Sequence, residues 1–387
     1  MTTTLLFTYH RYQHTKTVVD ALMRNTVKPE KLIVFQDGVK DSTNIEGWNK
    51  VNQLIHELKF CDTEVIVSKS NKGLAQSIIE GIDYAFQSCD QVIVLEDDCV
   101  PAVDFMNYME QAFEAYRDSK DVWSISGYAW PIEVASNDYD AYFTGRVSSW
   151  GWGTWKDRWQ YYEQDFSIID RIKSNQQTAK NLLCWGRDLE QMLMDRKAQR
   201  NDSWAVFWAL IVIEQMGKCL APINSLIMNI GMDGTGTNCG VTHTYDVTLY
   251  DGISVKYSFT EKTVFEQSII QQFISLLGSE FSISSGQFEA EHILAYGAGN
   301  YIKQNDKFLL EHYFIEAVID KNQNGYMGGI KIIKPHEISE FPDIDIIIMI
   351  YDRQVCEEVK EMLIFKYGID EKRIKLGSKL IKEISEI

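Results

Sequence analysis

Residues 91–98 read QVIVLEDD, an apolar run that ends in three consecutive carboxylates. The apolar run has the composition of a strand that is buried on both faces of a sheet. Glu96, Asp97 and Asp98 at its end cannot be buried together unless a positive charge compensates them. The stretch therefore predicts a buried strand whose carboxyl end binds a divalent cation that carries a diphosphate.

The first hundred residues alternate between strand-like and helix-like segments. Strand patterns cover 4–9, 31–36, 64–67 and 91–95, and helical periodicity covers 15–24, 46–59 and 73–86. This order predicts an α/β fold with a mainly parallel sheet flanked by helices. Because ligands of such sheets bind at the carboxyl ends of the strands, His10, Arg11, Asp37 and the acidic triplet are expected to meet in one cleft.

The length of 387 residues predicts two domains. We expect a first domain over 1–280, with a nucleotide-binding half at 1–103, an aromatic-rich half at 104–240 and a connecting segment at 241–280. A second alternating unit, with strand patterns at 292–296, 314–319 and 345–350, predicts a small Rossmann-like domain over 288–387.

Composition limits the partners and the compartment. The net charge of −17 disfavours nucleic acid and broad contact with anionic membranes. The seven cysteines include no C-x-x-C pair, which argues against a disulfide framework or a structural zinc site. No secretory leader pattern or run of about 20 apolar residues occurs, so a cytoplasmic protein is expected.

The C-terminal unit carries a partial dinucleotide fingerprint. Gly297 and Gly299 are spaced as in that motif, but Ile302 occupies the place of its third glycine. Asp320 ends the next predicted strand, where a ribose-binding acid would lie. The two interpretations are cofactor binding and a packing or dimerising role.

Residues 94–105, VLEDDCVPAVDF, resemble the metal-binding strand exit of the N-acetylglucosaminyltransferase I-like and family 2 glycosyltransferases, which are inverting enzymes of the GT-A fold. The resemblance runs in order over about residues 4–240. It implies that Asp98 binds Mn²⁺ or Mg²⁺, that Asp97 approaches the ribose or the waters of the metal, and that Glu96 contacts the donor sugar. An acidic turn that caps the next helix is the alternative.

Two upstream segments share the resemblance. Residues 8–11, TYHR, resemble the first-strand exit of these enzymes, which implies that Arg11 lies beside the nucleotide. Residues 33–37, IVFQD, resemble the second-strand exit, which implies that Asp37 accepts the N3–H of uracil, a donor that cytosine lacks. A surface charge at Arg11 and a plain Asp-Gly turn at Asp37 are the alternatives.

Two downstream segments extend the resemblance. Residues 148–155, SSWGWGTW, resemble the Gly-Trp segment near the donor sugar, which implies contacts from Trp150 and Trp152. An aromatic core is the alternative, and it is the interpretation that we favour for Trp155 and Trp159. Residues 201–204, NDSW, resemble the helix start that carries the catalytic base, which maps onto Asp202. Asp202 also suits the N-cap of a helix that starts at 205.

The resemblance ends in a strand and a glycine-containing loop. Residues 217–231 resemble the closing strand of these enzymes, and the glycine-rich stretch 232–240 suggests a lid over the bound donor. Asn238, Cys239 and Gly240 stand where the family pattern has a histidine, so a diphosphate contact from this loop is not implied. His243 is interpreted as a surface residue.

The predicted function is metal-dependent, inverting transfer of a sugar from a UDP-sugar to a hydroxyl of a glycan, lipid-linked or glycoprotein acceptor, in bacterial glycan assembly. A homodimer and peripheral membrane association are further partner hypotheses. Two other classes stay open. An NAD-dependent sugar-nucleotide enzyme would need a complete glycine motif, and a non-catalytic glycan-binding scaffold would bind glycan without metal or nucleotide.

Overall fold

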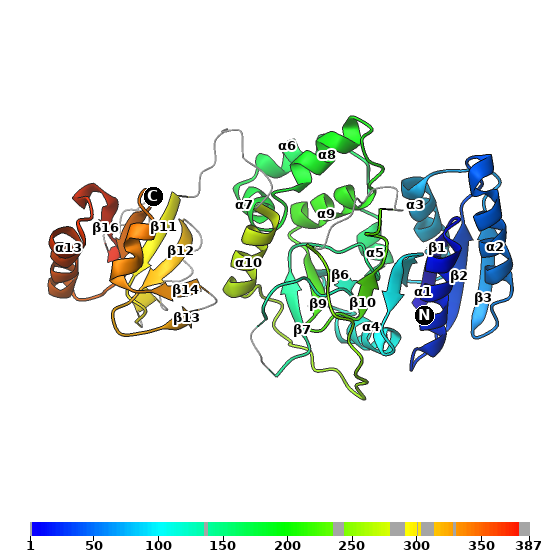
Figure 1. Ribbon diagram of the computed structural model, residues 1–387, viewed down its shortest axis with the longest axis horizontal. Coiled ribbons are helices and arrows are strands. Elements are labelled where there is room, and N and C mark those ends of the chain that lie inside the picture. Colours follow the sequence, from blue (N-terminus) through cyan, green and yellow to red (C-terminus); the bar gives the residue numbers. More distant parts are fainter. Residues whose placement is uncertain are drawn as a thin grey trace. The chain divides into compact units, whose positions relative to one another are not determined.

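The computed structural model describes residues 2–134, 138–234, 244–278, 291–299, 301–302, 313–327 and 330–378. The chain divides into two compact units, Met1–Phe281 and Ser282–Ile387. The expected linker near 281–287, most of the expected lid and His243 lie outside the described residues. Figure 1 shows the elements of both units.

The N-terminal unit contains a mixed sheet with the strand order β3-β2-β1-β4-β8-β6-β9-β7 (Figure 1). Its strands are β1 (Thr2–Thr8), β2 (Lys31–Gln36), β3 (Asp62–Val67), β4 (Gln91–Glu96), β6 (Val122–Ser126), β7 (Ala141–Thr144), β8 (Trp152–Trp155) and β9 (Lys218–Pro222). The first four strands are parallel, and β8 continues the sheet antiparallel to β4. The predicted parallel α/β sheet is therefore confirmed.

Helices cover both faces of this sheet. Leu6 of β1 packs in a core with α1 (Tyr12–Arg24), α2 (Ile45–His56) and α4 (Phe105–Ala115). Leu5 and Phe7 point to the opposite face, where α3 (Leu74–Ala85) and α9 (Ala205–Glu214) cover them. Because successive strand residues alternate between faces and both faces are buried, these strands read as continuous apolar runs.

The remaining elements of this unit are short helices and a small two-stranded sheet. They are η1 (Ser42–Asn44), α5 (Lys156–Trp159), α6 (Ile168–Lys173), α7 (Gln176–Trp185), α8 (Leu189–Lys197), α10 (Gln267–Gly278), β5 (Cys99–Pro101) and β10 (Ile227–Asn229). The stretch 104–240, which has no regular pattern in the sequence, thus supplies half of the large sheet and most of the helices on one face.

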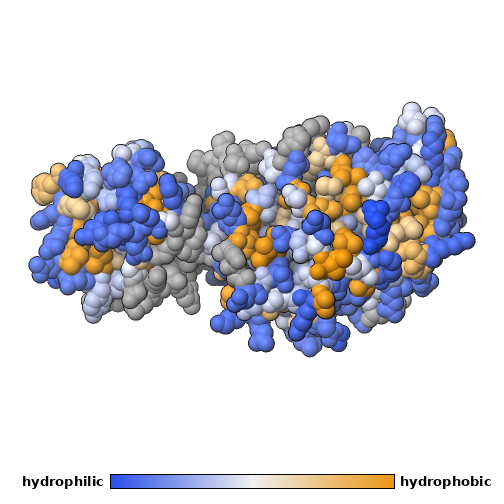
Figure 2. Space-filling view, turned by 60° about the horizontal axis from the view of Figure 1, so that its bottom comes forward, coloured by the Kyte–Doolittle hydropathy of each residue, from blue (hydrophilic) through white to orange (hydrophobic). Residues whose placement is uncertain are grey.

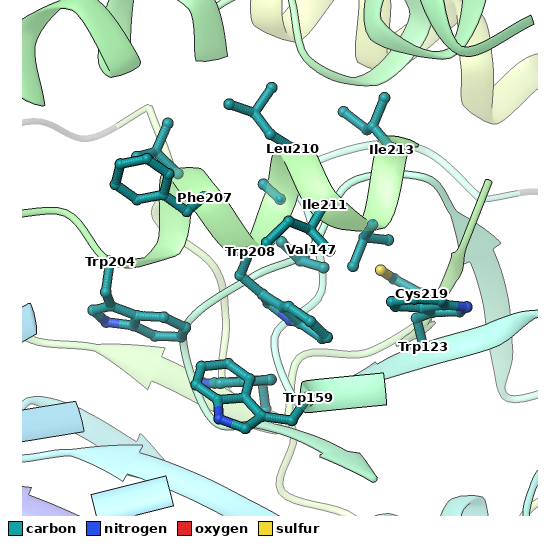
Figure 3. Packing of buried hydrophobic residues seen from close by; sticks show 14 of the residues in the cluster. Trp123, Val147, Trp159, Trp204, Phe207, Trp208, Leu210, Ile211, Ile213 and Cys219 are labelled. Carbon is teal, nitrogen blue, oxygen red and sulfur yellow. The ribbon is translucent and has the colours of Figure 1, made fainter. Parts of the chain in front are cut away.

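A cluster of tryptophans forms the core beneath α9 (Figure 3). Trp152 is opposite Val94 of β4 in the strand register, so both side chains point to the α9 face. Its indole stacks on Trp204 at 5.2 Å between ring centroids and packs near Trp159 and Trp208 at 6.0 Å. The predicted core role of Trp159 agrees with its place in this cluster.

Replacing Trp152 with alanine is expected to lower the free energy of unfolding of the N-terminal unit by about 3–5 kcal/mol, because it leaves a large cavity in a fully buried site. Urea denaturation followed by tryptophan fluorescence measures this, since all ten tryptophans lie between 48 and 208 and report on this unit. Met194→Ala removes an apolar side chain that is 53% exposed and serves as the control. Equal stability of both variants and the wild type would contradict the cavity argument.

The C-terminal unit contains a second, mainly parallel sheet with the order β13-β14-β12-β11-β15-β16. Its elements are β11 (Glu291–Tyr296), β12 (Tyr313–Ile319), β13 (Gly325–Met327), β14 (Ile330–Ile333), η2 (Pro335–Glu340), β15 (Asp345–Ile348), α13 (Arg353–Tyr367), η3 (Glu371–Arg373) and β16 (Ile374–Leu376). Only β13 runs antiparallel to its neighbour.

Asp320, the expected ribose-binding acid, binds the backbone of its own unit. Its Oδ2 accepts from the N–H of Ala298 at 2.9 Å, and its Oδ1 accepts from the N–H groups of Asn322 at 2.8 Å and Gln323 at 2.9 Å. The carboxylate therefore ties the turn after β12 to the loop between Gly297 and Gly299. This arrangement gives the residue a structural task, and it lends no support to the NAD hypothesis.

The surface agrees with the acidic, polar composition. On the face shown in Figure 2, hydrophilic side chains surround separate hydrophobic patches. Among the helices of the described residues, none has both the length and the apolar character needed to cross a bilayer.

Candidate active site

A cleft of about 1050 Å³ opens at the carboxyl ends of β1, β2 and β4 in the N-terminal unit. The lining includes most of the residues predicted from the sequence, namely Arg11, Asp37, Glu96, Asp97, Asp98, Trp150 and Asp202. Side chains from opposite ends of the large sheet thus meet in one space. Trp152 is missing from this lining, because it lies in the tryptophan core.

The acidic triplet shares one arginine. The Arg11 guanidinium donates to Asp98 Oδ2 at 2.8 Å and also contacts Asp97 Oδ1. This cluster contains three carboxyl groups and a single guanidinium, so its acidic groups outnumber its basic one. Burial works against the charge of Arg11, but Asp97 and Asp98 outweigh this and raise the pKa of the guanidinium. Arg11 therefore stays a cation across the physiological pH range.

The pKa values of two of the acids are raised in this cluster. Burial, followed by the charges of Asp98 and Asp97, raises the pKa of Glu96 well above its usual range. Burial also raises the pKa of Asp97 to about 6, although Arg11 opposes the change. Such shifts mark a site where an additional cation would be bound favourably.

A short antiparallel pair fixes the position of Asp98. β5 directly follows the triplet and pairs with β10, and the N–H of Ile230 donates to the carbonyl of Asp98 at 2.9 Å. This brings Gly231 against the carboxylate, where an added Cβ would lie 2.2 Å from Asp98 Oδ2. A glycine is therefore required at 231, and the sequence alone gave no indication of this contact.

The donor set of the triplet fits a hard divalent cation. Among the described residues, no three His, Cys, Asp or Glu side chains are arranged around a common metal position. A cation such as Mn²⁺ or Mg²⁺ needs only one or two protein carboxylates when phosphate oxygens and waters complete its shell. Asp98 and Asp97 supply such oxygens beside a site that lacks positive charge.

The carboxylate of Asp37 accepts hydrogen bonds within the protein. Its Oδ1 accepts from the N–H groups of Gly38 at 2.8 Å and Lys72 at 2.9 Å, and its Oδ2 accepts from Asn71 Nδ2 at 2.9 Å and the N–H of Gly73 at 3.0 Å. Asp37 therefore holds the loop before α3, and it also lines the cleft, where its contact with uracil stays a prediction.

Asp202 also lines the cleft, and its carboxylate contacts two helices. Its Oδ2 accepts from the N–H of Ala75 in the first turn of α3 at 3.2 Å, and Arg196 Nη2 lies 3.1 Å from its Oδ1. The expected N-cap role for the following helix is wrong, because Trp204 occupies the N-cap of α9 without a side-chain hydrogen bond. Asp202 instead stabilises the start of a helix more than a hundred residues earlier in the chain.

The two tryptophans that are predicted to face the donor sugar lie in different environments. Trp150 lines the cleft and makes edge contacts with Tyr128 at 4.7 Å and Tyr245 at 6.0 Å between ring centroids. Trp152 is 0% exposed, so its predicted contact with the sugar is corrected to a core role. Trp150 precedes β8 and is separated from it by Gly151, whose φ is +55°, whereas Trp152 belongs to β8 and points to the α9 face.

Sequence reasoning missed a buried ion pair in the wall. Arg146 donates to both oxygens of Asp188, at 2.8 and 2.7 Å, and both residues line the cleft. A pair of this kind, two donors to two acceptors, fixes the orientation of both side chains. Neither residue belongs to a recognisable motif, because the contact joins the end of β7 to the start of α8.

Comparison with known proteins gives two family matches. Residues 4–177 match the profile described as glycosyl transferase family 2, and residues 289–375 match the profile described as C2185-like, N-terminal. No curated protein matches the chain.

Solved structures of transferases are similar at low identity. TarS of S. aureus matches with 10% identity and a TM-score of 0.27, over 36% of this chain and 24% of that chain. TarS 1-349 in complex with UDP-GlcNAc matches with 12% identity and a TM-score of 0.28, over 40% of this chain and 44% of that one. The mannosyltransferase PcManGT from Pyrobaculum calidifontis, in complex with GDP-Man and Mn²⁺, matches with 10% identity and a TM-score of 0.29, over 56% and 68%.

This chain therefore spans about a quarter of the full TarS structure and less than half of the TarS 1-349 complex with UDP-GlcNAc. The profile match begins in β1 and includes the acidic triplet. Over residues 4–177 the chain is therefore similar to glycosyl transferase family 2.

Proposed function

We propose that the N-terminal unit is a metal-dependent, inverting glycosyltransferase that moves a sugar from a UDP-sugar to a hydroxyl of a glycan acceptor. The observation that carries the proposal is the cleft itself. It is lined both by an acidic triplet with too little positive charge at one strand end and by a carboxylate, Asp202, from a distant segment. A donor and an acceptor in this cleft would meet the groups that a single displacement needs.

The donor half would receive the diphosphate. Arg11 Nη1 is buried and has no hydrogen-bond partner among the described residues, so this guanidinium lacks one acceptor. A phosphate oxygen is a suitable acceptor for it. Asp98 and Asp97 would hold Mn²⁺ or Mg²⁺, which offsets the negative charge that develops on the leaving diphosphate. Glu96 would lie toward the donor sugar.

The acceptor half would supply the base. In the proposed step, Asp202 takes the proton of the acceptor hydroxyl while the hydroxyl oxygen bonds to the anomeric carbon of the donor sugar. The bond from that carbon to the diphosphate oxygen breaks with its electron pair, and UDP leaves on the opposite face. The configuration at the carbon is inverted. Trp150 offers an aromatic face for the C–H surface of a sugar.

The choice of uridine comes from the resemblance of the strand-exit motifs, in which Asp37 would accept the N3–H of uracil. The acceptor is proposed as a glycan, free or carried by a lipid or a protein, in bacterial glycan assembly. A cytoplasmic location and a homodimer are further proposals that can be checked by fractionation and by mass in solution.

Isothermal titration of UDP and of GDP, each with and without Mn²⁺, tests the donor part of the proposal. We expect UDP to bind in the presence of Mn²⁺, and EDTA to abolish or greatly weaken that binding. Transfer is then measured by release of UDP from a panel of UDP-sugars with oligosaccharide acceptors. Preference for GDP would mean that the donor is a GDP-sugar and not a UDP-sugar. A lack of nucleotide binding in every condition would overturn the proposal.

A further inference from the structure

The loop that carries Asp202 is fixed at both ends. Asn201 Nδ2 donates to the carbonyl of Met192 in α8 at 3.2 Å, which ties the loop to the helix before it. Trp204, two residues after Asp202, stacks on Trp152. Figure 3 shows Trp204 in the tryptophan core. The backbone at 202 is therefore held in place, and the direction of its carboxylate depends on the groups that contact it.

Two groups from different helices contact that carboxylate. Arg196, in the last turn of α8, places Nη2 3.1 Å from Oδ1, and the N–H of Ala75 in α3 lies 3.2 Å from Oδ2. One oxygen is thus oriented by each helix. Arg196 is the cation of this arrangement, and the start of α3 adds the positive end of a helix dipole.

Arg196 does not have the contacts of an arginine that serves the fold alone. Its Nε is buried and has no acceptor among the described residues, and its one ion-pair partner there is Asp202. By contrast, Arg171 of α6 pairs with three carboxylates, those of Glu163, Asp165 and Glu214. A buried donor without an acceptor costs stability, so its retention calls for an explanation.

We propose that Arg196 is the positioning residue of the acceptor half, which orients the Asp202 carboxylate so that it can accept the proton of the acceptor hydroxyl. This inference depends on the proposed function, and it adds a residue that neither the motifs nor the family resemblance indicate. A general base must lie within hydrogen-bond reach of the hydroxyl and point at it. The ion pair with Arg196 fixes the direction of the carboxylate.

The other charged groups nearby do not replace Arg196. Burial raises the pKa of Tyr162, which lies near both Arg196 and Asp202, so this phenol stays neutral. Asp83 of α3 also acts on Tyr162 and carries a negative charge. The cations Lys72 and Arg200 also line the cleft, but they pair with the acids Glu80 and Asp195.

The test compares three variants in the transfer assay: Arg196→Gln, Arg196→Lys and, as a matched control, Arg200→Gln. Arg200 follows four residues later, lines the same cleft and pairs with Asp195. For each protein, kcat and KM for donor and acceptor are measured across pH. Titration of UDP with Mn²⁺ and the fluorescence-detected unfolding transition establish that the donor site and the fold are intact.

Arg196→Gln is expected to lower kcat by about 10²-fold, because the carboxylate loses its orientation, while KM for the donor and the affinity for UDP with Mn²⁺ stay within a few-fold of the wild type. Arg196→Lys should recover only part of kcat, since lysine keeps the charge and lacks the planar fork. Arg200→Gln should leave kcat unchanged.

An unchanged kcat in Arg196→Gln, with or without lower stability, would overturn the inference and leave Arg196 a structural residue. An equal loss of kcat in Arg200→Gln would also overturn it, because general charge in the cleft would then explain the effect. If the proposed function itself is wrong, a different result is expected from the one that contradicts the role of Arg196. In that case Asp202→Asn would retain transfer, or the wild type would show none.

Discussion

Asp202→Asn is expected to lower the rate of sugar transfer by about 10²–10⁴-fold, the usual contribution of a general base. The amide keeps the size of the side chain but cannot take a proton from the acceptor hydroxyl. Its oxygen can still accept from the N–H of Ala75, so the start of α3 should remain capped. The affinity for UDP with Mn²⁺ is expected to stay within a few-fold of the wild type, because Arg11 and the acidic triplet form the proposed donor site.

Asp195→Asn is the matched control, since Asp195 lines the same cleft and pairs with Arg200 in place of Arg196. It removes the same charge from the same wall without touching the proposed base. Transfer kinetics and UDP titration are measured on both variants. Retention of transfer by Asp202→Asn would remove the base from the proposal, and equal losses in both variants would point to the general charge of the wall.

The N-terminal half of the fold could be predicted because its signals are local. Each strand from β1 to β4 is a short apolar run, and each helix between them has one apolar face. Arg11 and the acidic triplet were placed correctly in one cleft for the same reason, since residues at the ends of neighbouring parallel strands must be close. No knowledge of distant contacts was needed.

The sequence gives no signal where a side chain meets a partner from a distant segment. Asp37 ends a strand as predicted, and the loop before α3 folds back to supply donors that no pattern indicates. Trp152 looks like a neighbour of Trp150, but the register of β8 against β4 turns it into the core. Asp202 looks like the cap of its own helix and stabilises α3 instead. None of these contacts has a sequence pattern.

Asp98→Asn is expected to remove the effect of Mn²⁺ on UDP binding. Carboxylates that merely support a metal ligand contribute about 10–100-fold to metal affinity, so replacing the proposed ligand itself should cost at least this much. In the wild type, Mn²⁺ and UDP together should raise the unfolding temperature, because both bind the folded protein. In Asp98→Asn this increase should be absent, while UDP alone should bind as weakly as it does to the metal-free wild type.

The stability of the metal-free protein distinguishes a metal-binding role of Asp98 from a structural one. Glu96, Asp97 and Asp98 repel one another around a single arginine, and the charge of Asp98 is one cause of the raised pKa of Glu96. Removing one of the three charges relieves that repulsion, so metal-free Asp98→Asn should be at least as stable as the metal-free wild type. Lower stability in the absence of metal would mean that Asp98 serves the fold through Arg11. An unchanged response to Mn²⁺ would mean that the metal binds elsewhere.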